Sequence, residues 1–499
     1  MAHEAISSAS GERQPTDEAV WTQRFVDLAP RTEALLLIDF GSTYTKLTAV
    51  EAESGRLLGT AQHPTTVDTD LLHGYEVARK ALGSVLNDAA FTETLACSSA
   101  GGGLRLAIIG LEPELTVEAA RRAALNAGAR VVTAISRGLT KGNLVKLVEA
   151  RPDIVLLAGG TNGGNASVFI ESARVLAESS IDVPIVLAGN EQAQPTAFDL
   201  LHAGGKRGLA TPNLMPEVGV IHESAVREAI RALFISHVIG GKHLSSRAEF
   251  AGMVLMATPD AVLTATELLA AGVGKEPGFG DLMVVDLGGA TTDVHSVVHS
   301  DHQAGYVQEL APIPQASRTV EADLGLRWSA VAILEAASAE IPSRGVSHLR
   351  AGAELRAANP RFVAESQTEM KTDLELAGCA IEIAVRRHAG RLTIELSPQG
   401  AALRKSGRDL RAISNVVLSG GIFRHAAPDQ LAILCPDFAG DKEIMLPRHA
   451  RFAVDRAYLL AAAGLLATRN RPAAFALMNQ ELVHLSHLSR EGLPCSASN

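Results

Sequence analysis

Runs of apolar residues that end in glycine recur along this chain. The run at 34–41 reads ALLLIDFG, and similar runs follow at 153–160, 183–189, 281–289 and 412–421. Continuous apolar runs of this length, bounded by glycine, are typical of strands that are buried on both faces of a sheet. We therefore expect an α/β protein whose strands open into glycine-rich loops.

The segment from about 105 to 245 alternates short apolar runs with amphipathic stretches. The valines at 131–132 and the runs at 153–160 and 183–189 indicate strands, whereas 141–150 and 166–179 have helical character. Strands that alternate with helices are typical of βαβ units. The pattern predicts a parallel sheet in this part of the chain.

The run at 281–289 repeats the pattern of 34–41, and a third such junction at 412–421 follows a mainly helical stretch. This repetition predicts two related lobes that face a shared cleft, with a boundary near residue 280. The expected divisions are a flexible tail (1–30), the start of the first lobe (31–104), an α/β insert (105–245), a return segment of the first lobe (246–280), the second lobe (281–470) and a C-terminal tail (471–499).

Composition narrows the class of protein. Of the 499 residues, 47% are hydrophobic and 20% are charged, which supports large aliphatic cores and excludes general disorder. The net charge of −10 provides no overall basic surface for nucleic acid. The four cysteines are singly spaced, the first segment is polar, and the longest apolar run (457–467) is too short for a bilayer. We therefore expect a soluble cytoplasmic protein with reduced thiols.

The first strand-to-loop junction with a chemical pattern is Asp39–Lys46, DFGSTYTK. A carboxylate at a strand end, followed by glycine and two hydroxyls, is suited to hold Mg²⁺ and to cradle a phosphate with backbone amides. Gly41 allows the close backbone approach that this requires. The alternative is an ordinary β-turn whose hydroxyls satisfy nearby backbone groups.

The second junction, Asp286–Asp293, reads DLGGATTD and has the same parts in the same order. Two such loops at corresponding strand ends are suited to clamp the β- and γ-phosphates of one nucleotide, with a metal between Asp39 and Asp286. The third junction, 418–422, offers a bare glycine backbone against which an adenosine would lie.

These three segments resemble the phosphate-1, phosphate-2 and adenosine motifs of the ATPase superfamily that includes actin, the sugar kinases and Hsp70. Residues 455–466 are similar to its connecting helix of small residues, and the chain has no Walker A pattern. Further segments narrow the resemblance, over about residues 34 to 470, to the MutL-type accessory proteins of glutamate mutase. These segments are 38–46, 97–105 (CSSAGGGLR), 157–165 (LAGGTNGGN), 287–296 (LGGATTDVHS) and 319–325 (TVEADLG).

The resemblance implies two ribonuclease-H-like, actin-like ATPase lobes with a βαβ insert, and ATP and Mg²⁺ as ligands. It also implies a chaperone-like reactivating factor for an adenosylcobalamin-dependent mutase such as glutamate mutase. In that role, weak ATP hydrolysis is coupled to the release of damaged cobalamin, and the partner is a subunit of the mutase.

The resemblance also implies roles for individual residues. Asp39 and Asp286 are the Mg²⁺-associated carboxylates, and either Asp39 or Asp293 orients the attacking water. Lys46 either neutralises phosphate or is a solvated surface residue. The implied phosphate contacts are Gly41, Ser42, Thr43, Gly288, Gly289, Thr291 and Thr292, and the implied adenosine contacts are Gly420 and Gly421.

Four other segments have less specific patterns. The segment 97–103 favours a backbone turn over a nucleophile, because no histidine partner is placed beside Cys97. The segment 157–165 is either a contact for a ligand or partner, or a structural loop. The valines around His295 and His299 favour a strand over a zinc site. Glu321 and Asp323 either face the cleft or cap a helix that begins near Leu324.

The insert resembles a flavodoxin-like cobalamin-binding domain but lacks the DxHxxG segment that supplies a cobalt ligand. We therefore expect it to dock to the mutase rather than to ligate cobalamin. Two other functions stay open at this point. One is a hydantoinase- or oxoprolinase-type ATP-dependent amidohydrolase subunit, and the other is an actin-like scaffold that polymerises with ATP.

Overall fold

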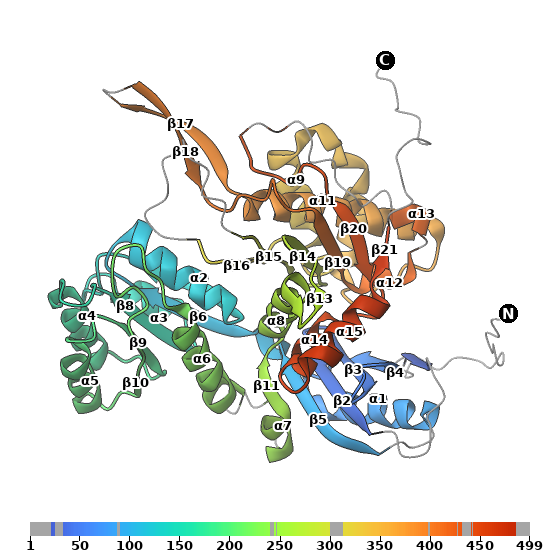
Figure 1. Ribbon diagram of the computed structural model, residues 1–499, viewed down its shortest axis with the longest axis horizontal. Coiled ribbons are helices and arrows are strands. Elements are labelled where there is room, and N and C mark those ends of the chain that lie inside the picture. Colours follow the sequence, from blue (N-terminus) through green and yellow to red (C-terminus); the bar gives the residue numbers. More distant parts are fainter. Residues whose placement is uncertain are drawn as a thin grey trace.

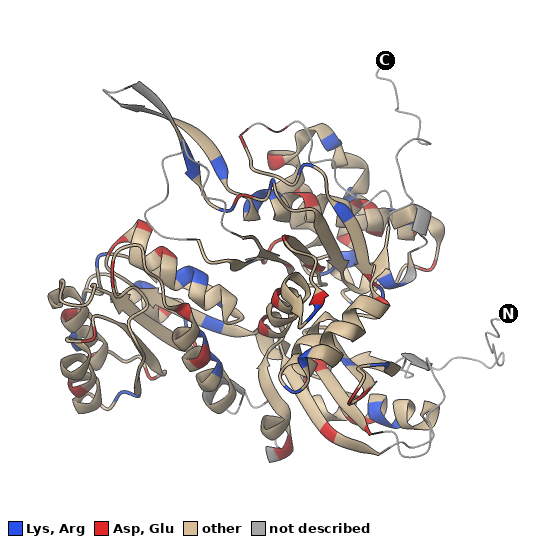
Figure 2. Ribbon diagram, in the orientation of Figure 1, with Lys and Arg blue, Asp and Glu red and all other residues tan. Residues whose placement is uncertain are grey.

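The computed structural model describes residues 21–24, 33–86, 90–239, 244–245, 247–299, 313–397, 400–426, 428–431, 441 and 443–485. In this part of the chain, two mixed sheets form two lobes, and a parallel sheet lies to one side of them (Figure 1). Acidic and basic residues are interspersed over all three parts (Figure 2). No helix of the described ranges combines the length and the apolar character needed to cross a membrane.

The sheet of the first lobe has the strand order β1-β4-β3-β2-β5-β11. β2 pairs antiparallel with β3 and parallel with β5, and all seven of its residues are buried, as the apolar run at 34–41 predicts. The elements are β1 (Trp21–Arg24), β2 (Ala34–Phe40), β3 (Tyr44–Glu51), β4 (Leu57–Pro64), α1 (Leu71–Val85), β5 (Phe91–Ser98), α7 (Ala248–Met253) and β11 (Val254–Ala257). Within the expected tail at 1–30, β1 pairs with β4, and the other residues lie outside the described ranges.

The insert is a parallel sheet with the order β7-β6-β8-β9-β10. Numbered along the chain, this is the 2-1-3-4-5 order of doubly wound, flavodoxin-like folds. Its strands are β6 (Leu104–Ile109), β7 (Ala129–Ile135), β8 (Ile154–Gly159), β9 (Ile185–Gly189) and β10 (Gly208–Ala210). Its α-helices are α2 (Glu118–Asn126), α3 (Leu144–Glu149), α4 (Ser167–Ala177), α5 (Gln194–Ala203) and α6 (Glu223–Leu233).

The sheet of the second lobe has the order β16-β15-β14-β19-β20-β21. β14 pairs antiparallel with β15 and parallel with β19, and β19 pairs parallel with β20. The strands are β14 (Leu282–Leu287), β15 (Thr292–Val297), β16 (Ala316–Glu321), β19 (Asn415–Ser419), β20 (Arg451–Asp455) and β21 (Val483–His484). The helices packed with this sheet are α9 (Ala330–Glu340), α10 (Arg350–Ala358), α11 (Gln367–His388), α12 (Gly421–His425) and α13 (Pro428–Leu431). A hairpin of β17 (Arg391–Ser397) and β18 (Gly400–Ser406) projects from the lobe (Figure 1).

The two lobes share one topology. β4-β3-β2-β5-β11 and β16-β15-β14-β19-β20 have the same order and the same succession of antiparallel and parallel pairs. This is the ribonuclease-H-like arrangement, so the predicted fold class is confirmed. Because β2 and β14 are the matching central strands, their carboxyl ends are matching positions.

Helices α8 (Thr258–Ala271) and α14 (Leu460–Ala467) lie between the lobes, and α15 (Arg471–Glu481) follows α14. Their apolar residues form one core with β2 and β14, including Leu37 and Val284. A Cβ at Gly464 would lie 1.9 Å from the carbonyl oxygen of Ala261, so glycine is needed where α14 crosses α8. The helix expected from residue 455 begins at 460, because Asp455 is still the last residue of β20.

Candidate functional site

The loops after β2 and β14 contain the same turn. The Gly41 amide donates to the Tyr44 carbonyl at 3.1 Å, and the Gly288 amide donates to the Thr291 carbonyl at 2.9 Å. A Cβ at Gly41 would lie 2.6 Å from the Tyr44 carbonyl oxygen, so the first turn excludes a side chain at this position. The similar sequences of the two loops therefore fold into similar turns.

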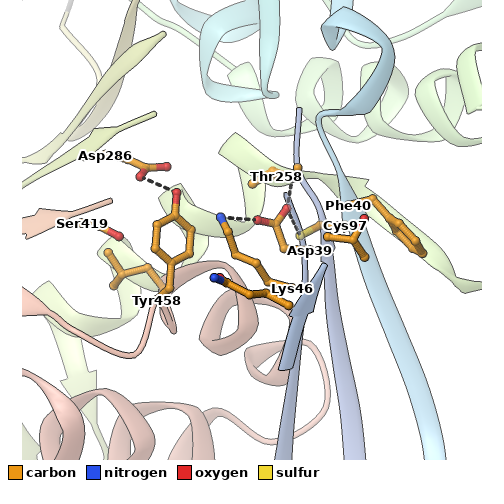
Figure 3. Close-up of polar contacts among 12 residues, drawn as sticks. Asp39, Phe40, Lys46, Cys97, Thr258, Asp286, Ser419 and Tyr458 are labelled. Atoms are coloured by element: carbon orange, nitrogen blue, oxygen red, sulfur yellow. Dashed lines mark hydrogen bonds and ion pairs between the residues drawn. The ribbon is translucent and has the colours of Figure 1, made fainter. Parts of the chain in front are cut away.

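The two strand-end aspartates face the space between the lobes. Side chains two residues apart on a strand lie on one face, and Asp39 and Asp286 each follow by two residues a member of the core between the lobes, Leu37 or Val284. Figure 3 shows the two carboxylates on opposite sides of this space. The structure thus brings together the two residues predicted to associate with Mg²⁺.

Lys46 and Tyr458 bridge the two aspartates. The Lys46 Nζ lies 3.3 Å from Asp39 Oδ2 and 3.2 Å from the centre of the Tyr458 ring. The Tyr458 hydroxyl donates to Asp286 Oδ1 at 3.2 Å (Figure 3). Lys46 is partly buried here, so its ammonium supplies positive charge between the lobes and is not a solvated surface group.

The carboxyl of Asp286 has a raised pKa. Burial raises its pKa to about 7, and the neighbouring carboxylates of Asp293 and Asp39 add to the rise, while Lys46 and the Tyr458 hydroxyl oppose it. A carboxylate that is desolvated among other carboxylates is stabilised by a cation. Oxygen donors of this kind are the ligands that Mg²⁺ prefers, so the residues present fit the metal that the sequence predicts.

The two helices between the lobes begin at the site. The hydroxyl of Thr258, the first residue of α8, donates to Asp39 Oδ1 at 2.7 Å. Asp455 accepts the amides of Leu459 and Leu460 at 2.8 to 3.1 Å and so caps the start of α14, and it also accepts the Ser419 hydroxyl at 3.2 Å. Asp39 is therefore one contact away from α8, and Ser419 at the end of β19 is one contact away from the residue that caps α14.

The loop hydroxyls differ in what they contact. Thr43 Oγ1 is buried without a hydrogen-bond partner among the described residues, and a Cβ at Gly289 in the other loop would lie 3.2 Å from it. A buried hydroxyl without a partner costs free energy, so its position between the two loops suits it to bind a phosphate oxygen. Ser42 is exposed, and the Thr291 hydroxyl donates to Asp293 Oδ2 at 3.1 Å.

Thr292 does not join the predicted phosphate contacts. Its side chain is fully buried, and its hydroxyl donates to the Leu324 carbonyl at 2.6 Å. Because side chains alternate along β15, Thr292 lies on the opposite face from Asp293. The hydroxyl pair in the sequence thus divides into one loop hydroxyl and one that anchors the loop to the core.

Asp293 is held by a buried arginine. Arg318 on β16 donates its Nε to Asp293 Oδ1 at 2.8 Å, and its side chain is 3% exposed. With Thr291 on its other oxygen, Asp293 is fixed from two sides. Asp39 and Asp293 both lie close enough to Asp286 to raise its pKa.

The two glycines of the junction after β19 differ in exposure, Gly420 being buried and Gly421 exposed. Gly420 has φ +143, and a Cβ there would lie 2.4 Å from the Leu287 carbonyl oxygen. Gly421 is exposed, and a Cβ there would meet open space. Gly420 is therefore required for packing against the end of β14, whereas Gly421 leaves a bare surface.

The 319–325 segment packs against the second phosphate loop. A Cβ at Gly325 would lie 2.3 Å from the carbonyl carbon of Ala290, so glycine allows this segment to pack directly on the loop. Glu321 lies directly opposite Thr292 where β15 pairs with β16. Glu321 and Asp323 do not cap a helix. Both pair with Arg387 of α11 at 2.8 Å, and α9 begins only at residue 330.

The segments at 97–103 and 157–165 and the side chain of His299 have structural surroundings, whereas both ring nitrogens of His295 are buried without a hydrogen-bond partner among the described residues. Cys97 is buried, and burial raises the pKa of its thiol, which opposes reactivity; the turn that follows holds three glycines at positive φ. The 157–165 loop is tied down by side-chain amides of Asn190 and Asn213. His295 lies on strand β15 and His299 pairs with Asp281 at 2.7 Å.

Sequence reasoning missed Tyr458, Asp455, Thr258 and Arg318 as members of the site. Tyr458 has φ 62, a left-handed conformation that no pattern in the sequence predicts. Asp455 and Thr258 could have been found from their residue types. Aspartate and threonine often cap helices, and each of these residues stands before or at the start of a helix.

Comparisons with known proteins agree on one family. A family model described as MutL protein matches residues 35–482. Protein MutL of Clostridium tetanomorphum is 38% identical over 459 residues, which cover 90% of this chain and 99% of that protein.

Solved structures resemble the chain more distantly. Nucleotide-free acetone carboxylase is 11% identical, with a TM-score of 0.35 over 87% of this chain and 70% of that one. A ROK family glucokinase from Streptomyces griseus, in complex with glucose and AMPPNP, is 12% identical, with a TM-score of 0.27 over 90% of this chain and 99% of that one. Similarities of this size add nothing to the fold described above.

Proposed function

The chain belongs to the MutL protein family, and on this premise we propose that it is an ATP-dependent reactivating factor for an adenosylcobalamin-dependent mutase such as glutamate mutase. The resemblance of its motifs to MutL-type accessory proteins supports the choice of partner. The nucleotide part of the proposal rests on one observation above all: Asp39 and Asp286, from matching strand ends of the two lobes, face one shared space across Lys46 and Tyr458.

Each part of the site has a role in holding Mg²⁺ and ATP. When bound, the metal supplies positive charge that neutralises the phosphates. Asp39 and Asp286 would hold it, and backbone amides of the two loops other than those of Gly41 and Gly288, with the hydroxyls of Thr43 and Thr291, would contact the phosphate oxygens. Lys46 adds a second positive charge, and the exposed backbone at Gly421 receives the adenosine.

The site is placed to act as a switch between the lobes. A ligand shifts a conformational equilibrium only when it binds the two states with different affinity. ATP contacts both loops and ADP loses the γ-phosphate contact, so the two nucleotides favour different separations of the lobes. We infer that the mutase is opened by one of these states, which lets a damaged cobalamin leave.

The test is recovery of enzyme activity. Glutamate mutase is inactivated with hydroxocobalamin and incubated with the protein, ATP, Mg²⁺ and adenosylcobalamin. We expect activity to return with the unchanged protein and not with Asp286→Asn. The matched control is Glu354→Gln, which changes an exposed carboxylate on α10 and is expected to reactivate normally.

Three outcomes would count against the proposal. If other mutases of this class are also tried and none recovers, the partner is wrong. If Asp286→Asn reactivates as well as the unchanged protein, the carboxylate pair has no role. If ATP is consumed stoichiometrically with a hydantoin or oxoproline, or drives filament formation, one of the other functions replaces this one.

A further inference from the structure

Arg318 joins the second phosphate loop to the insert. While its Nε donates to Asp293 Oδ1 at 2.8 Å, its Nη1 donates to the carbonyls of Leu125 and Ala129 at 3.0 Å each. Leu125 lies in the last turn of α2, and Ala129 begins β7. A single buried guanidinium therefore contacts both a candidate nucleotide residue and the insert.

A second contact fixes the same end of α2. The side-chain amide of Asn126 donates to the Ala316 carbonyl on β16 at 3.0 Å, and it also approaches Glu223 of α6. Asn126 is fully buried, and the hydrogen bonds of its side-chain amide go to Ala316 and Glu223. The end of α2 is thus attached to β16 at two points, of which only one reaches the nucleotide loop.

The insert is attached to the first loop as well. Arg227 and Arg231 of α6 pair with Asp260 of α8 at 3.2 and 2.6 Å, and the Asp260 side chain is 1% exposed. Two residues earlier, Thr258 donates to Asp39. The insert is consequently connected to both lobes through residues next to the candidate nucleotide site.

The bond between Arg318 and Asp293 lies where a ligand at the second loop would act on it. Removing one partner from a buried ion pair is costly, because it leaves the other charge uncompensated. A Mg²⁺-nucleotide at the second loop would compete with Arg318 for the Asp293 carboxylate. Arg318 would then have to move, and its hydrogen bonds to the carbonyls of Leu125 and Ala129 would change with it.

We propose that Arg318 is a positioning residue that transmits occupancy of the second phosphate loop to the insert, so that binding of a Mg²⁺-nucleotide loosens the attachment of α2 to β16. This rests on the proposed binding of nucleotide between the lobes. The proposal adds the segment that moves, which is the end of α2, and the residue that causes the movement, which is Arg318.

Hydrogen–deuterium exchange of the full chain, with and without saturating Mg²⁺-ATP, tests the coupling. We expect ATP to speed exchange of the amides at 118–130 by on the order of fivefold, the lower range of coupling between linked sites. In Arg318→Lys this change is lost, because one ammonium cannot reach Asp293 and the carbonyls of Leu125 and Ala129 together. The control Arg121→Lys alters an exposed arginine on the same helix and is expected to respond like the unchanged protein.

Affinity provides a second test that remains if Arg318→Lys does not fold. Coupling between sites is reciprocal, so loosening α2 by Asn126→Ala is expected to tighten Mg²⁺-ATP binding severalfold, although Asn126 does not contact the site. A purely structural role of Asn126 would leave the affinity unchanged or weaken it, and either result would overturn the proposal.

Failure of the coupling and failure of nucleotide binding give different results. Unchanged or slower exchange at 118–130 in a protein that binds ATP overturns the coupling and leaves nucleotide binding intact. The same holds if the change persists in Arg318→Lys. Absence of ATP binding to the unchanged protein overturns the proposed function and the coupling with it.

Discussion

Lys46 and Asp293 occupy equivalent positions in the two lobes and carry opposite charges. Each lies directly opposite the strand-end aspartate of its own sheet, Lys46 opposite Asp39 and Asp293 opposite Asp286. The shared topology therefore produces an asymmetric site. The first lobe contributes a carboxylate with its own cation, and the second contributes two carboxylates, one of which is paired with Arg318.

The first prediction concerns this cation. Lys46→Met removes the positive charge next to Asp39 and the charge that opposes protonation of Asp286. We expect ATP affinity to fall by roughly tenfold or more, as for loss of a charged hydrogen-bonding group. Titration with a fluorescent ATP analogue measures this. Lys141→Met, at an exposed lysine of the insert, is the control, and an equal loss there would contradict a specific role for Lys46.

The glycine pair after β19 separates packing from binding. Gly420→Ala would place a methyl against the Leu287 carbonyl at an unfavourable φ, so we expect the free energy of unfolding to fall by about 2 kcal/mol or more. Gly421→Ala meets open space, and we expect stability to change by less than about 0.5 kcal/mol while adenosine affinity falls. Urea unfolding and ADP titration give the two values. Equal stability losses would refute the distinction.

Acid sensitivity follows from His388 on α11. Burial lowers its pKa to about 3, with a contribution from Arg408, and its ring contacts the hydroxyls of Ser296 and Thr319. Since the folded pKa lies below the unfolded value of 6.5, its stabilising contribution is complete above pH 6.5 and is lost as the pH falls toward 3. Between pH 7.5 and 4.5 this amounts to about 3 kcal/mol.

The variant His388→Gln is therefore expected to lose less stability over that interval than the unchanged protein, although it is less stable at pH 7.5. Urea unfolding at the two pH values measures both quantities. His348→Gln is the control, because His348 is an exposed histidine whose ion pair contributes little. A loss in His388→Gln as large as in the unchanged protein would assign the acid sensitivity to other groups.

Much of the fold is readable from the apolar runs. The strands at 34–40, 154–159, 185–189, 282–287 and 415–419 coincide with runs that end near glycine, because a strand buried on both faces needs apolar residues throughout and the loop beyond it needs backbone freedom. The helix boundary near residue 455 was wrong. A capping aspartate ends a strand there, and small residues alone do not reveal where the helix starts.

The sequence predicts the residues of the site only where two similar loops repeat one pattern. Asp39, Asp286 and Lys46 meet because matching strands place them, which the repetition implies. Thr292 shows where prediction from residue type fails. Its neighbour Thr291 has the same side chain, but side chains alternate along β15, so the hydroxyl of Thr292 points into the core. Tyr458 and Arg318 reach the site from distant segments through side-chain directions that a single sequence does not encode locally.

The central claim is that ATP bound between the lobes opens a mutase so that damaged cobalamin leaves. The most direct measurement is the rate at which hydroxocobalamin separates from inactivated glutamate mutase, followed by its absorbance after gel filtration. We predict that release is fast only when the protein, ATP and Mg²⁺ are all present, and that Asp286→Asn abolishes the acceleration. Release that is independent of nucleotide, or equally fast with Asp286→Asn, would contradict the account.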